Sequence, residues 1–404
     1  MTAEVSESQR LIHRARRNVI FLAMCQALYM TGTSMVLTVT ALAGSAIAPT
    51  PSLGTLPLSL QFVATMAATI PASLLMRRYG RRMGFTIGAI SGVIGAGISL
   101  FALLRGDFVL FSLGAVLIGI LNGCAIYYRF AAADTADAAF RPKAISLVMA
   151  GGVVAAFLGP NLATYTVELF PEATYAGCFA ALIGLHGLTI LILLGIDIPS
   201  PTAAERLDNG APLGQILRRP AIAVAVLAGV AGYSSMNLVM TATPLSMVAH
   251  HYAFSDAAMV IQWHVFAMFA PSFFTGHLIA RFGAPRIIMA GAALILACVA
   301  INLHGDSLWH FLGALVALGG GWNFMYVGGS ALLTSAHDVA ERAKVQALNE
   351  FLVFGSVALA SFASGAVQFG YGWMAVNLVV MPLTLLSLLA AVWLTVKRPA
   401  STAS

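Results

Sequence analysis

The sequence has 404 residues, of which 59% are hydrophobic and only 9% are charged, and its formal net charge is +6. Charged residues make up about a quarter of a typical soluble domain, so this composition excludes an ordinary soluble protein and indicates a chain that lies mostly in lipid. The basic excess does not indicate nucleic-acid binding, because the arginines and lysines lie in short loops between apolar segments.

Twelve apolar segments are long enough to cross a bilayer. A hydrocarbon core of ~30 Å needs about 20 helical residues at 1.5 Å per residue. Segments of this kind lie at 18–42, 54–76, 83–104, 108–130, 144–167, 175–196, 220–243, 257–280, 286–304, 308–333, 344–367 and 373–396. Each is predicted to be a helix, because backbone groups in hydrocarbon find partners only within their own segment. The predicted fold is an all-α membrane protein with twelve transmembrane helices.

The basic residues are spread unevenly over the loops. Twelve spans place both termini on one side, and 20 of the 21 lysines and arginines fall on that side or at its edge, Arg105 being the exception. Because Lys and Arg concentrate in cytoplasmic loops, both termini are predicted to be cytoplasmic, in a bacterial inner membrane. The four cysteines fall inside predicted helices, so no disulfide framework is expected.

The two halves of the chain repeat each other. "SLLMRRYG" at 73–80 matches "GHLIARFG" at 276–283, an offset of 203, and "DAAFRPKAISL" at 137–147 matches "DVAERAKVQAL" at 338–348, an offset of 201. Six helices in each half place both copies the same way up, as parallel repeats. We predict an N-terminal bundle over 1–196, a cytoplasmic linker over 197–219 and a C-terminal bundle over 220–404.

With these features the chain resembles the major facilitator superfamily over nearly its whole length. The family signature between the second and third helices is roughly G-x-L-a-D-R-x-G-R-[KR], and residues 73–82 read "SLLMRRYGRR", with Ser73 for the first glycine and Arg77 for the acid. The second copy keeps Gly276, Arg281 and Gly283. The resemblance implies a secondary transporter in which two bundles rock around a central site by alternating access.

The subfamily stays open. Drug/proton antiporters of this superfamily often carry an arginine in helix four where this chain has Gly119, and of their helix-five motif only Gly159 and Pro160 are present. Sugar porters often space an acid and an arginine by six residues, as in Asp134 and Arg141, but the second half has Ser335 before Arg342. Efflux of drugs or metabolites and uptake of a vitamin-like or aromatic nutrient remain alternatives.

Charged residues at the helix ends suggest gates. Arginines in loops need acidic partners or water, and acids follow helices four and ten. We therefore expect Arg77, Arg78 or Arg81 to pair with Asp134 or Asp137, and Arg281 to pair with Asp338 or Glu341, with Gly80 and Gly283 permitting tight turns. A few such pairs can bias a conformational equilibrium, although an exposed pair contributes only ~0–1 kcal/mol. The alternative is that these arginines only anchor the loops in the cytoplasm.

Three polar residues inside the spans are candidates for proton or solute binding. Glu350 in helix eleven lies ~9 Å below its start, and a charge within the bilayer usually serves a function. His264 in helix eight changes charge near neutral pH, and its repeat mate is Gln61. Glu350 and His264 are the predicted ion-coupling residues. The alternatives are a hydrogen bond within the bundle for Glu350 and a satisfied core histidine for His264.

The remaining candidates line the helices that the family uses for its path, namely one, four, seven and ten. Arg129 follows two tyrosines at the end of helix four and suits an anionic or aromatic solute, or simply snorkels to the cytoplasm. Tyr233 and Asn237 share a face of helix seven. The predicted substrate-binding set is Gln26, Tyr29, Gln61, Tyr127, Arg129, Tyr233, Asn237, His264, Trp322, Asn323, Tyr326 and Asn349. Together they favour an amphipathic, partly aromatic small molecule.

These features predict a transporter of a small organic solute that is coupled to protons. No P-loop, G-x-S-x-G or H-E-x-x-H motif points to an enzyme, and no cofactor or metal site is expected. The expected partners are the solute, protons and the bilayer, with no nucleic acid, and the chain is expected to be a monomer. A non-transporting receptor or scaffold of the same fold is the minor alternative.

Overall fold

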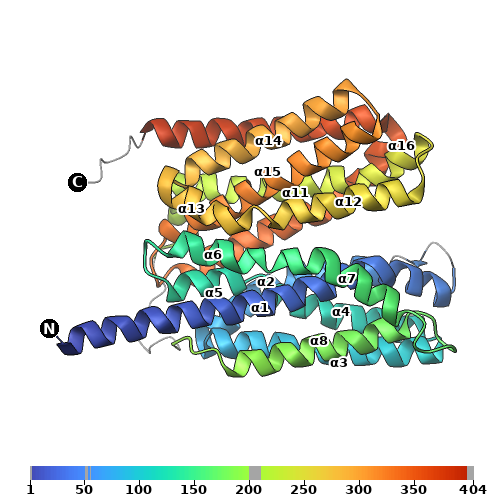
Figure 1. Cartoon of the computed structure of the whole chain (residues 1–404), viewed down its shortest axis with the longest axis horizontal. Coiled ribbons are helices and arrows are strands. Elements are labelled where there is room, and N and C mark those ends of the chain that lie inside the picture. Colours follow the sequence, from blue (N-terminus) through green and yellow to red (C-terminus); the bar gives the residue numbers. More distant parts are fainter. Residues whose placement is uncertain (1, 51–52, 55, 200–210, 398–404) are drawn as a thin grey trace. The chain divides into compact units, whose positions relative to one another are not determined.

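The computed structural model describes residues 2–50, 53–54, 56–199 and 211–397, and its elements are α-helices (Figure 1). In the first half they are α1 (Thr2–Ile47), α2 (Leu56–Tyr79), α3 (Arg81–Arg105), α4 (Phe108–Ala125), α5 (Tyr128–Thr135), α6 (Arg141–Ala150), α7 (Gly152–Thr166) and α8 (Ala176–Leu194). In the second half they are α10 (Leu213–Leu217), α11 (Pro220–Ala249), α12 (Phe254–Phe269), α13 (Ser272–Phe282), α14 (Ala284–His304), α15 (Leu308–Ser335) and α16 (Arg342–Lys397).

The described residues contain 11 helices that are long and apolar enough to cross a membrane, and a twelfth span if α12 and α13 are one bent helix. These two helices meet at an angle of 40° at Pro271, whose ring cannot donate the backbone hydrogen bond that a continuous helix needs. Two spans are joined within α16, where Gly372 has φ of 78°. The predicted fold class is confirmed, and the helices follow the predicted segments in order.

The fourth span differs from its repeat mate. It is broken after Ala125, since Ile126 and Tyr127 form a turn before α5 begins, whereas α15 runs unbroken from Leu308 to Ser335. The sequence predicted one helix over 108–130 and did not predict the break. This break carries the carboxyl end of the span, including Asp134, on a separate short helix.

The chain divides into two compact units. The first contains residues 1–137 and 147–208, and the second contains residues 138–146 and 209–404. In the first unit α3 packs against both α4 and α8 (Figure 1), and in the second α11 packs against α16 and α15 against α14. The middle of the predicted linker, residues 200–210, lies outside the described residues.

Glycines allow the helices within each unit to approach closely. A Cβ on Gly119 would lie 2.5 Å from the carbonyl oxygen of Gln61, and a Cβ on Gly319 would lie 2.6 Å from that of His264. Gln61 and His264 are repeat mates, so the two units have the same glycine contact, between α2 and α4 in one and α12 and α15 in the other. Small residues at such contacts are typical of helices packed in lipid.

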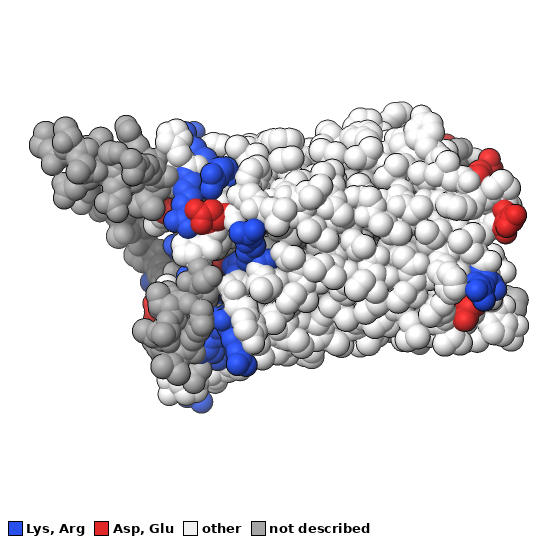
Figure 2. All heavy atoms as spheres, turned by 90° about the horizontal axis from the view of Figure 1, so that it is seen from below, with Lys and Arg blue, Asp and Glu red and all other residues white. Residues whose placement is uncertain are grey.

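The outward faces are apolar. Figure 2 shows a broad uncharged surface with lysine and arginine gathered at one end. Exposed side chains of the first unit include Leu74, Ile94, Leu104, Val109 and Leu113. Large exposed apolar side chains are expected where the surrounding solvent is hydrocarbon, so these faces fit an integral membrane protein.

Two glycines turn the chain at equivalent points of the repeat. Gly80 lies between α2 and α3 with φ of 91°, and Gly283 lies between α13 and α14 with φ of 85°. A residue with a Cβ is strained at these angles, so glycine is required for the sharp turn. The predicted role of both glycines in tight turns is confirmed.

Candidate functional site

An ion pair closes one end of the first unit. The Nε and NH2 atoms of Arg81, the first residue of α3, donate to Oδ2 of Asp134 at 3.0 and 2.9 Å. The two side chains are only 9% and 8% exposed, and the guanidinium carbon of Arg81 lies 5.7 Å from the ring centre of Tyr127. Arg81 with Asp134 is one of the pairs that the sequence allowed.

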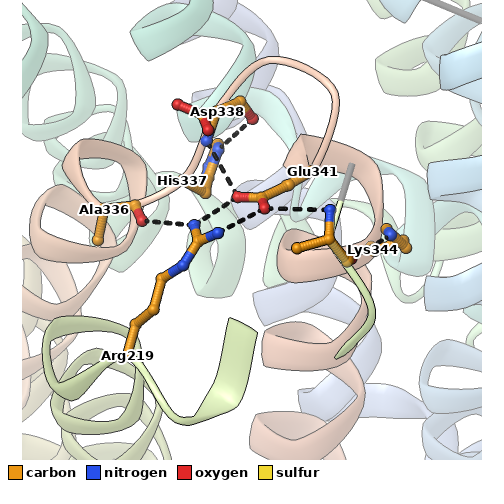
Figure 3. Close-up of polar contacts among 7 residues, drawn as sticks. Arg219, Ala336, His337, Asp338, Glu341 and Lys344 are labelled. Atoms are coloured by element: carbon orange, nitrogen blue, oxygen red, sulfur yellow. Dashed lines mark hydrogen bonds and ion pairs between the residues drawn. The ribbon is translucent and has the colours of Figure 1, made fainter. Parts of the chain in front are cut away.

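The corresponding prediction for the second unit is wrong. Glu341 is bound by Arg219, whose NH1 and NH2 atoms donate to the two carboxylate oxygens at 2.6 and 2.7 Å (Figure 3). Arg281 lies instead over the ring of Phe282, 5.2 Å from its centre. Glu341 immediately precedes α16 and Arg219 immediately precedes α11, and these two helices pack side by side from their first turns.

The repeat offsets explain why the second half needed another arginine. At an offset of 203 the mate of Arg81 is Ala284, and at an offset of 201 the mate of Asp134 is Ser335. Arg281 is the mate of Arg78, whose guanidinium carbon lies 5.3 Å from the ring centre of Tyr79, so both arginines contact the aromatic residue that follows them. The second half therefore has no ion pair at the positions equivalent to Arg81 and Asp134, and the guanidinium that binds Glu341 comes from Arg219.

Further hydrogen bonds surround Glu341. The backbone N–H groups of Asp338 and Ala211 donate to its carboxylate at 3.3 and 3.4 Å, and Nζ of Lys344 donates to the carbonyl oxygen of Ala211 at 2.7 Å (Figure 3). We call Arg219, Ala211, Asp338, Glu341 and Lys344 the Glu341 clamp. It fastens the chain segment before α11 to the loop between α15 and α16.

The clamp holds Glu341 ionised. Hydrogen bonds from Arg219 hold the pKa of the Glu341 carboxyl below its usual 4.5, and the same bonds raise the pKa of Arg219. The side chain of Glu341 is 3% exposed while that of Arg219 is 38% exposed, so the carboxylate depends on the clamp for the hydrogen bonds that water would otherwise supply.

We expect Glu341→Gln to lower the thermal unfolding midpoint of the purified protein by a few degrees at pH 7, since a neutral amide replaces a charge-assisted acceptor. A carboxyl with a lowered folded-state pKa stabilises the fold above its unfolded pKa and loses that contribution as pH falls through the folded value. The difference between wild type and Glu341→Gln should therefore shrink as pH falls below 4.5. A difference that is constant with pH would contradict the clamp.

The other predicted gating residues lie around these two centres. Arg77 is half-buried near the end of α2 and Asp137 is exposed in the loop after α5, and each makes further contacts. Asp338 contributes its backbone to the Glu341 clamp, and its carbonyl oxygen lies 3.0 Å from Nδ1 of His337.

Aromatic rings gather in the interior of the second unit. The ring centre of Tyr233 lies 5.3 Å from that of Trp322, 5.1 Å from that of Tyr326 and 5.5 Å from that of Phe354. The first two contacts are edge-to-face, and Trp322 and Tyr326 stack on each other at 5.1 Å. We call Tyr233, Trp322, Tyr326 and Phe354 the aromatic cluster. Trp322 and Tyr326 are buried, whereas Tyr233 and Phe354 are half-buried.

A buried carboxyl lies one helical turn before this cluster on α16. Glu350 has no exposed surface, and Nδ2 of Asn349 donates to its Oε1 at 2.6 Å. A Cβ on Gly229 of α11 would lie 3.8 Å from the amide oxygen of Asn349 and 3.0 Å from Val353. The acid lies next to the point where α11 and α16 come close enough to exclude a side chain.

Several predicted site residues have their polar atoms engaged within the fold. Asn323 donates to the carbonyl oxygen of Met268 at 2.7 Å and to Oγ of Ser272 at 2.6 Å, and accepts from Thr275 at 2.8 Å. His264 has its Nδ1 2.7 Å from the carbonyl oxygen of Leu315. These contacts join α15 to α12 and α13, so both residues hold the unit together.

His264 and its repeat mate Gln61 each have one buried polar atom without a hydrogen-bond partner in the described part of the chain. These atoms are Nε2 of His264 and Oε1 of Gln61. Another histidine, His186, is buried in α8, where a Cβ on Gly32 would lie 3.3 Å from its ring. Its apolar neighbours gave no periodic signal that separates a buried histidine from an exposed one.

The predicted residues of the first unit form a second aromatic group. The rings of Tyr29 and Tyr128 lie 6.5 Å apart, and Gln26 is buried one turn before Tyr29 on α1. The hydroxyl of Tyr127 donates to the carbonyl oxygen of Thr69 at 2.8 Å. Arg129 is 2% exposed and donates to the carbonyl oxygen of Ile126 at 2.6 Å, so it caps the broken end of the fourth span and does not snorkel.

Sequence reasoning missed Arg219 and the two partners of the half-buried residues of the second unit. Phe354 contacts Tyr233, and Ser361 accepts a hydrogen bond from Nδ2 of Asn237 at 2.7 Å. Phe354 lies four residues after Glu350, a spacing that places both on one face of a helix and that was available in the sequence. Arg219 gave no such signal, because its role depends on a neighbour 122 residues away.

Packed membrane-spanning helices, glycine contacts at repeat-related positions and buried polar groups define the class: an integral membrane transporter. The chain belongs to the Major Facilitator Superfamily, whose family model matches residues 22–300 and again residues 227–404. The members of this family are transporters, so the chain is not an enzyme.

Among known proteins, the riboflavin transporter RfnT of Brucella anthropi is 42% identical over 376 residues, which cover 93% of this chain and 94% of that protein. The uncharacterised transporter YdeG of Bacillus subtilis is 29% identical over 407 residues, 96% of this chain and 93% of YdeG. Crystal structures of FucP, the E. coli fucose:proton symporter, are similar with TM-scores of 0.74 and 0.73 at 16% identity, covering 93% of this chain and 98% of FucP.

Proposed function

We propose that the protein imports riboflavin, or a flavin closely related to it, by alternating access. The observation that carries this proposal is the 42% identity to a riboflavin transporter over nearly the full length of both chains. The aromatic cluster agrees with it, because riboflavin has a planar fused ring system that stacks on aromatic side chains and a polyol chain that needs polar partners. The sequence alone left the solute and the direction open, and this relative favours a vitamin as the solute.

The proposed mechanism assigns three roles. The carboxyl of Glu350, which accepts a hydrogen bond from Asn349, binds and releases the coupling proton, as a carboxyl buried within a span is suited to do. The pair of Arg81 with Asp134 and the Glu341 clamp act as latches at one end of their units. Both termini lie in the cytoplasm of a bacterial cell, with the arginine-rich end facing inward and the protein working as a monomer.

The substrate-binding residues in this proposal are Tyr233 and Asn237 of the second unit, which are half-buried, and Gln26 and Tyr29 of the first unit, which are buried on α1. Gln61, Tyr127, Arg129, His264 and Asn323 act through the packing that they stabilise. His264 is thus a weaker proton carrier than Glu350.

Uptake by cells tests the proposal. Expressed in a bacterial strain that lacks riboflavin synthesis and its own riboflavin carrier, the protein should restore growth on low external riboflavin and accumulate labelled riboflavin. Cells with the empty vector provide the control. A strain in which the protein reaches the membrane but neither grows nor accumulates riboflavin would show that the substrate or the direction is wrong, and a receptor or scaffold would give this result.

A further inference from the structure

Two helices of the second unit run alongside each other in the same direction. Going along α11, Gly229 meets Val353, Tyr233 meets Phe354, Asn237 bonds to Ser361, and the carbonyl oxygen of Leu238 accepts from Ser364 at 2.9 Å. Residue numbers rise together on both helices, so α11 and the first span of α16 are parallel neighbours. Their shared seam therefore presents side chains from both helices in a fixed order.

The side chains along this seam change in chemical character. Glu350 and Asn349 come first, then the rings of Tyr233 and Phe354 one turn later, and then the amide and hydroxyl of Asn237 and Ser361. From Glu350 to Ser361 the seam extends about 16 Å along the axis at 1.5 Å per residue. A carboxyl, an aromatic pair and an amide–hydroxyl pair thus follow one another over the length of a vitamin-sized molecule.

The rings of the seam are held in place from behind. Trp322 and Tyr326 of α15 are 1% and 4% exposed, and both meet Tyr233 nearly at right angles, at 88° and 86°. Tyr233 is held by its ring contacts and is half-buried. A side chain that is fixed before binding loses little conformational freedom when a solute stacks on it, which favours affinity.

The polar end of the seam keeps an unused acceptor. The Nδ2 group of Asn237 donates to Oγ of Ser361 at 2.7 Å and to the carbonyl oxygen of Val357 at 3.3 Å. These bonds use the donors of the amide and leave its oxygen to accept from a hydroxyl or an imide N–H of a solute. The bonds to Ser361 and Val357 fix the orientation of the Asn237 amide, so its oxygen accepts only from a solute donor that is placed opposite it.

We propose that this seam is the flavin-recognition element of the transporter, with Tyr233 and Phe354 as the ring-contact residues and Asn237 as the acceptor for a solute donor. Trp322 and Tyr326 are positioning residues that act through Tyr233. The inference rests on the proposed function and deepens it, because it assigns selection of a planar heteroaromatic ring to one unit and to three residues of its seam, Tyr233, Phe354 and Asn237. The recognised solute is a fused heteroaromatic ring that carries a polyol chain.

Flavin fluorescence provides the test, since stacking of the isoalloxazine ring on tyrosine or tryptophan quenches its emission. Riboflavin is titrated with the purified full-length protein, and Tyr233→Leu, Phe354→Leu, Tyr233→Phe and Asn237→Leu are compared with wild type. Tyr233→Leu and Phe354→Leu should bind riboflavin roughly 10-fold more weakly, as expected when an aromatic contact is lost, while Tyr233→Phe keeps its affinity. Asn237→Leu should weaken riboflavin more than lumichrome, which has the ring system without the polyol chain.

Trp263→Leu is the matched control, because Trp263 is an aromatic residue of the same unit that is 48% exposed on α12 and contacts Phe266, outside the aromatic cluster. It should bind riboflavin like wild type. If wild type binds riboflavin and all four seam variants match it, the seam assignment is overturned while the proposed function survives. If wild type does not quench or bind riboflavin at all, the proposed function itself fails. If Tyr233→Leu does not fold, the affinities of Phe354→Leu and Tyr233→Phe for riboflavin are compared instead.

Discussion

Replacing Glu350 with glutamine is expected to abolish riboflavin accumulation that is driven by a pH gradient in proteoliposomes. A pH difference of one unit across the membrane corresponds to 1.36 kcal/mol per proton, so coupling to one proton supports up to about 10-fold accumulation of riboflavin. Glutamine cannot bind a proton, so the variant should not accumulate riboflavin. Glu350 is the expected carrier because it is buried, bonded to Asn349 and one turn from the aromatic cluster. Equilibration of riboflavin without a gradient should persist in the variant.

A second glutamate provides the control for this substitution. Glu168 is exposed in the loop after α7, so Glu168→Gln makes the same chemical change away from the proposed path. It should accumulate riboflavin like wild type under the same gradient. Accumulation in Glu350→Gln equal to that of Glu168→Gln would refute the proton assignment.

Replacing Asp134 with asparagine is expected to destabilise the protein strongly. Removal of one partner from a buried ion pair leaves the other charge uncompensated and costs about 3 kcal/mol, and Arg81 is 9% exposed. The thermal unfolding midpoint of the purified protein should fall well below that of Arg82→Gln, which removes an exposed arginine from the next position of α3. A double variant with Arg81→Asp and Asp134→Arg should recover part of the loss, as a cycle of the two single changes will show.

The same substitution tests the latch. If the pair of Arg81 with Asp134 holds one conformation, Asp134→Asn will change the rate at which single cysteines placed in the neighbouring loops react with a water-soluble thiol reagent. Unchanged reactivity at every such position, together with the expected loss of stability, would leave the pair a structural role and reject the latch.

The sequence was most informative where lipid imposes a rule. The lengths of the apolar segments predicted the spans, because a single segment that crosses hydrocarbon must be helical to satisfy its backbone hydrogen bonds. The repeat gave the positions of Gly80 and Gly283, because a turn with positive φ needs glycine in both copies. The bent eighth span and the broken fourth span were not predictable from hydropathy, which is the same on both sides of a turn at Ile126 or Pro271.

The pairing of charges was predicted correctly in the first half of the chain and wrongly in the second. Arg81 and Asp134 met as expected. In the second half the repeat predicted Arg281, but the positions that correspond to Arg81 and Asp134 hold Ala284 and Ser335, so the geometry of the first pair could not recur. Arg219 aligns with Arg17 at an offset of 202, and nothing in the repeat indicates that it bonds to Glu341.

The polar site residues were selected by type and helix, and packing separated them afterwards. Asn323 and Tyr233 both looked suitable from the sequence, but the amide of Asn323 is fully used by Met268, Ser272 and Thr275, while Tyr233 keeps exposed surface. Hydrogen bonds between helices that are far apart in the sequence cause this difference between Asn323 and Tyr233. Such bonds cannot be predicted from a single sequence.

Riboflavin counterflow tests the central claim that the chain is a flavin carrier most directly. Proteoliposomes preloaded with unlabelled riboflavin and diluted into a trace of labelled riboflavin should take up label above equilibrium for a time and then lose it, with no ion gradient required. Unlabelled riboflavin outside should suppress this uptake, and a sugar such as fucose should not. If folded protein in proteoliposomes takes up no more labelled riboflavin than liposomes without protein, the chain is not a flavin carrier.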